Sequence, residues 1–144
     1  MIILDKNFHF TPLVDLTAES TCYQDEIPKA IHEFIMENQN DTFVNGERVK
    51  VFHMSGFAKK HHYGLVDYLN KKLFQKRVAR IVEGQFAGFP LQHYWVSIDN
   101  IIIDLTVKQF INKSFTTSEA LRKLIDCHAF VSDNIDNYIY KLYR

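Results

Sequence analysis

A pair of short β-type segments joined by two turn-forming residues constrains this chain more than any other part of its sequence. The first segment is His93–Ile98, the second is Ile101–Thr106, and Asp99-Asn100 lies between them. Both segments are rich in β-branched and aromatic residues, and a two-residue connection of this kind is typical of tight hairpins. The sequence therefore predicts an antiparallel β-hairpin over residues 93–106.

The two-residue turn also determines which side chains share a face of the hairpin. Trp95 is expected opposite Asp104, and His93 opposite Thr106. Directly opposed residues point to the same side, and side chains alternate along each strand. The shared face then carries His93, Trp95, Ser97, Ile102, Asp104 and Thr106. His93 and Asp104 become diagonal neighbours with Cα atoms roughly 7–8 Å apart, close enough for their side chains to form a hydrogen bond.

Asp104 is an unusual residue for its place, because it directly follows three isoleucines in a strand. A carboxylate is costly to bury without a partner, and His93 on the same face supplies one. The simpler alternatives are that Asp104 only caps the turn after its strand and that His93 is an ordinary core or surface histidine. Asp99 is a competing partner for the histidine, but its place in the predicted turn suits turn geometry better.

Two other segments have the apolar spacing of amphipathic helices. The first stripe consists of Ile27, Ala30, Ile31, Phe34 and Ile35. The second stripe consists of Phe57, His61, Leu65, Tyr68, Leu69 and Leu73. This second stripe predicts a helix from about residue 57 to about residue 74. Each helix is expected to bury one face against the rest of the domain.

The start of the first helix involves one of the two cysteines of the chain. Thr21 is followed three residues later by Gln24, a spacing that fits a capping box and puts Cys22 at the first helical position. Pro28 complicates this interpretation, because a proline inside a helix removes a hydrogen bond and forces a kink. Either the helix bends at Pro28 or Cys22 lies on a separate preceding turn.

The remaining segments are predicted from shorter patterns. Residues 8–16 are apolar with an internal proline, which suits an edge strand or an extended arm. Residues 49–53 follow an Asn-Gly tight-turn dipeptide, and in residues 78–84 Val78, Arg80 and Val82 alternate with Ala79 and Ile81 before Gly84, so both segments are expected to contain short strands. The C-terminal third is interpreted as scaffold, with helices over 116–125 and 135–143.

Composition limits the class of protein. With 144 residues, 47% of them hydrophobic, the chain is expected to form a single domain over residues 1–144. The formal net charge is zero, so no nucleic-acid or membrane partner is expected from charge. The apolar N-terminal stretch is interrupted at once by Asp5, so it lacks the apolar run expected of a signal peptide. No later segment is long enough to cross a bilayer. The two cysteines, Cys22 and Cys127, do not indicate a disulfide scaffold, so a reduced cytoplasmic protein is expected.

No cofactor or metal is expected from the motifs. The chain has no nucleophile elbow, phosphate-binding loop or dinucleotide fingerprint, and only five glycines. His61-His62 with His53, or Cys127-His128, are conceivable zinc ligands. Adjacent histidines on a helix point in different directions, however, and no paired spacing supports a closed site. A polar helix face is the favoured interpretation of His61-His62.

The sequence resembles a family of enzymes at the residues already singled out. The strings His-Tyr-Trp-Val at 93–96, Ile-Asp-Leu-Thr at 103–106 and Gln-Phe at 109–110 resemble the histidine and aspartate region of papain-like and transglutaminase-like cysteine enzymes, including bacterial toxin-associated and phage-associated members. Cys22-Tyr23 resembles the nucleophile region of the same group, and the chain order Cys, His, Asp is met. One departure is that papain-type proteases place a glutamine shortly before the cysteine, and no glutamine precedes Cys22.

The resemblance implies an α+β fold in which an N-terminal helix presents the nucleophile to an antiparallel sheet, with C-terminal helices. It also implies a catalytic triad. Cys22 would attack an amide carbonyl as a thiolate, His93 would carry the proton, and Asp104 would orient the imidazole. The acyl-enzyme would then pass to water, an amine or another nucleophile, which gives hydrolysis, deamidation or acyl transfer.

Three further residues are candidates for binding the reacting group. Oxyanion stabilisation would come from the Cys22 backbone N–H and a second donor, for which Gln92 and Gln85 are the candidates. Trp95 is a candidate for positioning the substrate. The expected partner is a protein or a small amide, and the short chain favours side-chain or small-substrate amides over general proteolysis. An inactive papain-like binding or adaptor module is the alternative, and delivery to another cell as an effector or toxin is a third possibility.

Overall fold

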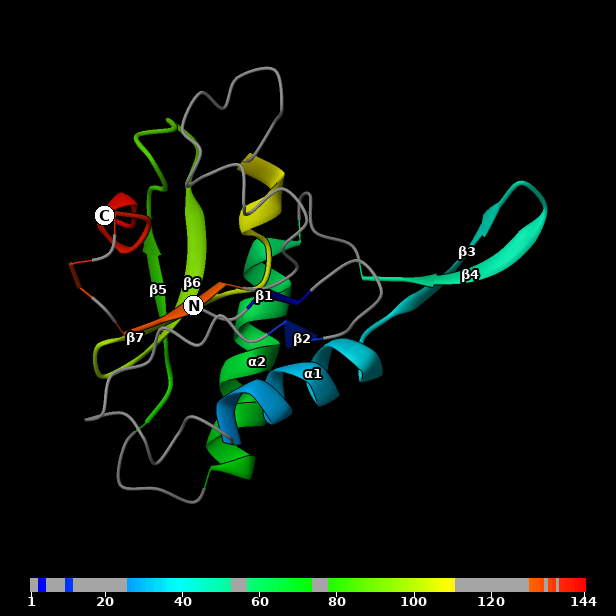
Figure 1. The fold of residues 1–144 in the computed structure, drawn as a ribbon, viewed down its shortest axis with the longest axis horizontal. Helices are drawn as coiled ribbons and strands as arrows, with labels where there is room; N and C mark the ends of the chain where they lie inside the picture. The colour runs from blue at the N-terminus through cyan, green and yellow to red at the C-terminus, as the bar shows by residue number, and fades with distance from the viewer. Residues whose placement is uncertain are drawn as a thin grey trace.

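The computed structural model has an α+β fold with antiparallel sheets (Figure 1). It describes residues 3–4, 10–11, 26–52, 57–73, 78–110, 130–133, 135–136 and 138–144. Within these residues, two α-helices lie beside a four-stranded sheet, and a separate two-stranded hairpin extends away from both (Figure 1). None of the helices described there is long and apolar enough to cross a membrane.

The four-stranded sheet is built around the predicted hairpin. Its strands, in spatial order, are β5 (Arg80–Gly84), β6 (His93–Ile98), β7 (Ile101–Asp104) and β8 (Phe130–Ser132), and every neighbouring pair is antiparallel. Strands β6 and β7 pair in the predicted register, and Asp99 in the turn adopts a positive φ of 52°. The hairpin, its turn and its register are therefore confirmed.

The two faces of this sheet belong to two different apolar clusters. One face contributes Val96, Ile98, Ile101 and Ile103 to the core that is shared with the helices. The opposite face contributes Trp95 and Ile102 to a second cluster, which also contains Phe86, Phe130 and Tyr143. The predicted alternation of side chains is confirmed, because Trp95 and Ile102 lie on the face expected for them.

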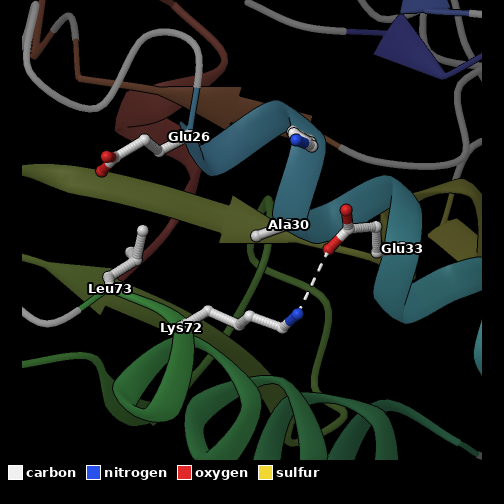
Figure 2. A pocket seen from close by; sticks show the side chains of 6 residues that line it. Glu26, Ala30, Glu33, Lys72 and Leu73 are labelled. Atoms are coloured by element: carbon white, nitrogen blue, oxygen red, sulfur yellow. Dashed lines mark ion pairs between the residues drawn. The ribbon is translucent and has the colours of Figure 1, made fainter.

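Helices α1 (Glu26–Glu37) and α2 (Ala58–Lys72) supply the other half of the main core. All five members of the first predicted stripe are buried, and so are Leu65, Leu69 and Leu73 of the second. Between the helices, Glu33 accepts a hydrogen bond from the Tyr68 hydroxyl at 3.0 Å. Figure 2 shows its ion pair with Lys72, at 3.7 Å. The two amphipathic helices are confirmed.

Pro28 lies in the first turn of α1, which begins at Glu26. The first N–H groups of a helix have no partner within the helix, so a proline is tolerated there. The expected difficulty of a proline deep inside the helix does not arise for α1. The proposed capping box at Thr21 and the position of Cys22 lie outside the described residues.

The separate hairpin consists of β3 (Asn40–Val44) and β4 (Glu47–Val51), with Asn45 and Gly46 at φ 51° and 80°. The Asn-Gly turn and the strand after it are confirmed. The strand before it was not predicted, because its polar residues carry no core-facing alternation, and most of its side chains are indeed exposed. His53, expected at the end of the second strand, lies outside the described residues.

The helix predicted over 135–143 is wrong. The described residues there form turns and a short 3-10 helix, η3 (Tyr140–Leu142), and the segment then pairs with the chain beyond β5. Gln85 and Arg144 exchange two backbone hydrogen bonds of 2.8 and 2.9 Å, and the Ala87 N–H donates to the Leu142 carbonyl at 2.8 Å. The apolar spacing arises because Ile139 and Tyr143 enter the second cluster, rather than from a helical stripe.

Other predicted segments are described only in part. Within the predicted edge strand, residues 10–11 form β2 (Phe10–Thr11), which pairs with β1 (Ile3–Leu4). The predicted strand over 78–84 is confirmed as β5. The helix predicted over 116–125 lies outside the described residues, and the short strand β8 had no sequence signal strong enough to be predicted.

Replacement of Gly84 by alanine is expected to lower the free energy of unfolding by roughly 1–3 kcal/mol. A Cβ at Gly84 would overlap the Arg144 backbone carbonyl and approach the Trp95 ring to 2.6 Å. The carbonyl is fixed by backbone pairing, so it cannot move aside without loss of hydrogen bonds. Urea unfolding of Gly84→Ala measures the effect.

Gly64→Ala is the matched control. Its Cβ would lie 3.1 Å from the tip of the Phe34 ring, so a shift of a few tenths of an ångström at the end of that side chain is enough to accommodate it. Alanine also has a helix propensity roughly 1 kcal/mol more favourable than that of glycine, which offsets the crowding. An equal loss of stability in both variants would contradict the packing described for Gly84.

Candidate functional site

The candidate site is centred on the Asp104 carboxylate, which is fully buried at the end of β7. Its Oδ2 atom accepts hydrogen bonds from His93 Nε2 at 2.7 Å and from the Tyr143 hydroxyl at 2.8 Å. Its Oδ1 atom accepts from the Thr106 backbone N–H at 2.8 Å and from the Thr106 hydroxyl at 3.3 Å. Both oxygens of the buried carboxylate are therefore supplied with donors, as a buried charge requires.

The ionised form of Asp104 is favoured in this environment. Burial alone raises the pKa of a carboxyl group, but the hydrogen bond from His93, together with the Thr106 backbone N–H, outweighs it and lowers the pKa of Asp104. An ionised carboxylate can only accept hydrogen bonds, so the proton between the two side chains belongs to His93 Nε2. The predicted contact between His93 and Asp104 is thus present, with a defined direction.

His93 has a second ring nitrogen that differs from the first. Its Nδ1 atom is buried and has no hydrogen-bond partner among the residues that the structure describes. The ring is fully buried, and the edge-on ring of Phe110 lies 4.6 Å away between centroids. In a neutral ring with its proton on Nε2, Nδ1 is an acceptor with a lone pair. A buried acceptor without a partner is uncommon in proteins and costs free energy.

His62 is a member of this site that the sequence did not identify. It lies on α2 with its side chain fully buried, and its Nδ1–H donates to the Ala58 carbonyl at 2.7 Å. Its Nε2 accepts the Leu105 backbone N–H at 2.9 Å, directly after Asp104. Burial lowers the pKa of His62 to about 4, so the ring is neutral near neutral pH. Its separation of 3.5 Å from Asp104 Oδ1 is therefore not an ion pair.

The polar helix face expected for His61 and His62 is wrong, because both side chains are buried. His61 stacks on Phe52 with centroids 4.0 Å apart, while His62 reaches the end of β7. The signal that was available is the spacing of His62 from Leu65 and Leu69, which places it on the buried stripe of the helix. Within the described part of the chain, no group of three or more potential ligands could hold a metal ion.

The three candidates for binding the reacting group have different environments. Gln92 is exposed and its side-chain oxygen accepts a weak hydrogen bond of 3.4 Å from the Tyr94 hydroxyl. Gln85 is exposed as well, with its backbone paired to the C-terminal segment. Trp95 is 4% exposed and packs edge-to-face on Tyr143, so it is a core residue, and the expected substrate-positioning role does not fit its burial.

A surface depression of about 450 Å³ lies on the far side of Phe110, whose ring also contacts His93. It is lined by Ala58, Lys59, Leu91, Gln92, Tyr94, Gln109 and Phe110. Phe110 contacts both the depression and His93, and Gln109 donates a hydrogen bond of 3.2 Å to the Thr106 hydroxyl. A second depression of about 320 Å³ includes both Gln85 and Gln92 in its lining. Gln92 therefore borders both depressions.

The nucleophile expected from the sequence, Cys22, lies outside the described residues, and so does Cys127. The structure brings together His93 and Asp104 of the predicted triad and adds Tyr143, Thr106 and His62 around them. Comparison of the chain with protein-family models, with curated proteins and with solved structures gives no match in any of the three.

The burial of neutral His62 predicts a pH dependence of stability. The folded protein keeps His62 unprotonated down to about pH 4, whereas the unfolded chain binds a proton near the ordinary pKa of 6.5. Stability from this residue is therefore fully present above pH 6.5 and decreases as the pH falls toward 4. The total loss is on the order of 3 kcal/mol.

His62→Gln tests this assignment, because a glutamine oxygen can still accept the Leu105 N–H but does not titrate. The variant is expected to be less stable than the wild type near neutral pH and to lose less stability on acidification. Urea unfolding at about pH 7 and about pH 5 measures how the free energy of unfolding changes with pH in each protein. An identical pH dependence of the free energy of unfolding in the two proteins would show that His62 is not a buried neutral group.

Proposed function

We propose that this chain is a cysteine-dependent amide-bond enzyme with a papain-like or transglutaminase-like arrangement of Cys22, His93 and Asp104. The observation that carries the proposal is the asymmetry of His93. One ring nitrogen is bonded to a buried carboxylate, and the other is buried without a partner among the described residues. An imidazole oriented in this way is what a cysteine nucleophile needs as its base.

The carboxylate gives His93 its tautomer. Because Asp104 fixes the proton on Nε2, the lone pair of Nδ1 is the one available to take a proton from a thiol. Once His93 is protonated, the same carboxylate stabilises the imidazolium. The buried and unpartnered Nδ1 supports the proposal, since the Cys22 thiol would provide the missing hydrogen-bond partner.

The proposed reaction proceeds in two stages. The Cys22 thiol transfers its proton to His93 Nδ1, and the thiolate attacks the carboxamide carbon to form a tetrahedral intermediate. The C–N bond then breaks as His93 returns the proton to the leaving nitrogen, which departs as ammonia or an amine and leaves a thioester. Water or an amine then attacks the thioester carbon and loses a proton to His93. The C–S bond breaks, and His93 returns the proton to the Cys22 sulfur as the product is released.

The depression that Phe110 separates from His93 supports an amide substrate. Its lining includes two side-chain carboxamides, Gln92 and Gln109, which offer both donors and acceptors to another amide group. Gln92 is also a candidate second donor to the oxyanion. The volume of about 450 Å³ suits a side chain or a small molecule better than an extended peptide. We therefore favour hydrolysis or transfer at a side-chain or small-molecule amide.

A catalytically inactive binding module is the alternative function. The complete burial of both His93 and Asp104 favours it, because a buried hydrogen-bonded network also serves to hold a fold together. In that case the exposed side chains around the depression would bind a partner. For the enzyme we propose a reducing cytoplasmic setting, in the producing cell or in a cell that receives the protein as an effector, because Cys22 must remain a free thiol.

Alkylation with iodoacetamide separates the two functions. Cys22 is expected to react roughly tenfold or more faster than Cys127 near neutral pH, with a pH midpoint below that of a free thiol, because an imidazolium favours the thiolate. In His93→Gln the rate at Cys22 should fall to that of Cys127. Slow and equal labelling of the two cysteines in the wild type would favour the binding module.

Ammonia release from candidate proteins and small carboxamides tests the reaction itself. Cys22→Ala is expected to lower the rate about 1000-fold or more, because the covalent route is lost. Cys127→Ala is the matched control and should retain the wild-type rate. An amide substrate that Cys22→Ala processes as fast as the wild type would exclude Cys22 as the nucleophile.

A further inference from the structure

The Oδ2 atom of Asp104 is shared by two donors, and one of them comes from a part of the chain with no expected role in the site. His93 Nε2 donates to this oxygen at 2.7 Å, and the Tyr143 hydroxyl donates to the same oxygen at 2.8 Å. We propose that Tyr143 is a positioning residue that regulates the basicity of His93 through Asp104. This inference rests on the proposed function where it concerns the Cys22 thiol.

The backbone around Tyr143 is held in place independently of its hydroxyl. Gln85 and Arg144 exchange two backbone hydrogen bonds, and Tyr143 forms a β-bridge with Phe86. Gly84 allows the Arg144 carbonyl to approach, since a side chain there would overlap it. The segment that carries Tyr143 is thereby fixed against the end of β5, next to the strand that carries His93.

The Tyr143 ring is fixed by packing as well. It is 9% exposed and contacts three aromatic rings of the second cluster, with centroid distances of 5.0 Å to Phe86, 5.1 Å to Trp95 and 5.6 Å to Phe130. Its hydroxyl is therefore directed at Asp104 by surroundings that do not depend on the hydrogen bond. A preorganised donor of this kind orders a carboxylate without further loss of side-chain freedom.

Sharing one oxygen between two donors has a direct electrostatic consequence. A donor to a carboxylate oxygen withdraws negative charge from it, so the Tyr143 hydroxyl weakens the attraction between that oxygen and the His93 Nε2 proton. Thr106 acts differently, because both of its donors bind Oδ1. Thr106 orients the carboxylate, whereas Tyr143 competes directly with His93 for Oδ2.

The test compares Tyr143→Phe with Tyr140→Phe in the complete chain. Tyr140 lies in the same segment, and its hydroxyl donates to the Asn100 carbonyl at 2.7 Å, away from Asp104. In Tyr143→Phe the His93 Nε2–H proton resonance is expected to move downfield, because His93 becomes the sole donor to Oδ2 among the described residues. In Tyr140→Phe the resonance should keep its wild-type position.

A second experiment strengthens the hydroxyl as a donor instead of removing it, so the His93 resonance is expected to move in the opposite direction. Biosynthetic replacement of tyrosine by 3-fluorotyrosine makes the phenol a stronger donor, so the His93 resonance is expected to move upfield. This measurement keeps the inference testable if Tyr143→Phe fails to fold. A resonance that stays in place in a folded Tyr143→Phe protein, or in the fluorinated protein, would overturn the inference.

Iodoacetamide labelling then separates this inference from the proposed function. A more basic His93 in Tyr143→Phe should lower the pH midpoint for alkylation of Cys22, by about one unit, relative to Tyr140→Phe. A moved resonance without a change in this midpoint would overturn the role of Tyr143 in thiol activation. If Cys22 in the wild type reacts no faster than Cys127 while the resonance still moves, the proposed function fails and the action of Tyr143 on His93 stands.

Discussion

The structure depends on keeping one carboxylate charged in a place where water does not reach. Asp104 is fully buried. Its two oxygens accept hydrogen bonds from His93 on β6, from Thr106 just after β7, and from Tyr143 near the C-terminal end. Removal of such donors would leave a buried charge without compensation, which costs several kcal/mol. Segments far apart in sequence are thus joined at a single side chain, and this requirement positions His93.

The hairpin could be predicted from the sequence because its determinants are local. A two-residue turn sets the register, the register sets the faces, and alternation then brings His93 and Asp104 to the same side. The same holds for α1 and α2, because their buried residues recur at helical spacing in the sequence. The position of Asp104 directly after three isoleucines was the local signal that this carboxylate would be buried and would need a partner.

The rest of the site could not be predicted, because it is made by contacts between distant segments. Tyr143 is 39 residues from Asp104, and its apolar neighbours mimic the spacing of a helix although they enter an aromatic cluster. The spacing of His62 indicates that it is buried, but only the fold shows that its ring meets the backbone of Leu105. Local periodicity specifies which residues are buried, but not which of them meet.

The proposed function requires that His93 Nδ1 acts as the base for the Cys22 thiol. A crystal structure that resolves both side chains tests this most directly, through the distance between Cys22 Sγ and His93 Nδ1. The account predicts a distance of about 3–4 Å, with Asp104 still bonded to Nε2. A thiol far from the ring, with Nδ1 bonded to another group, would contradict the claim.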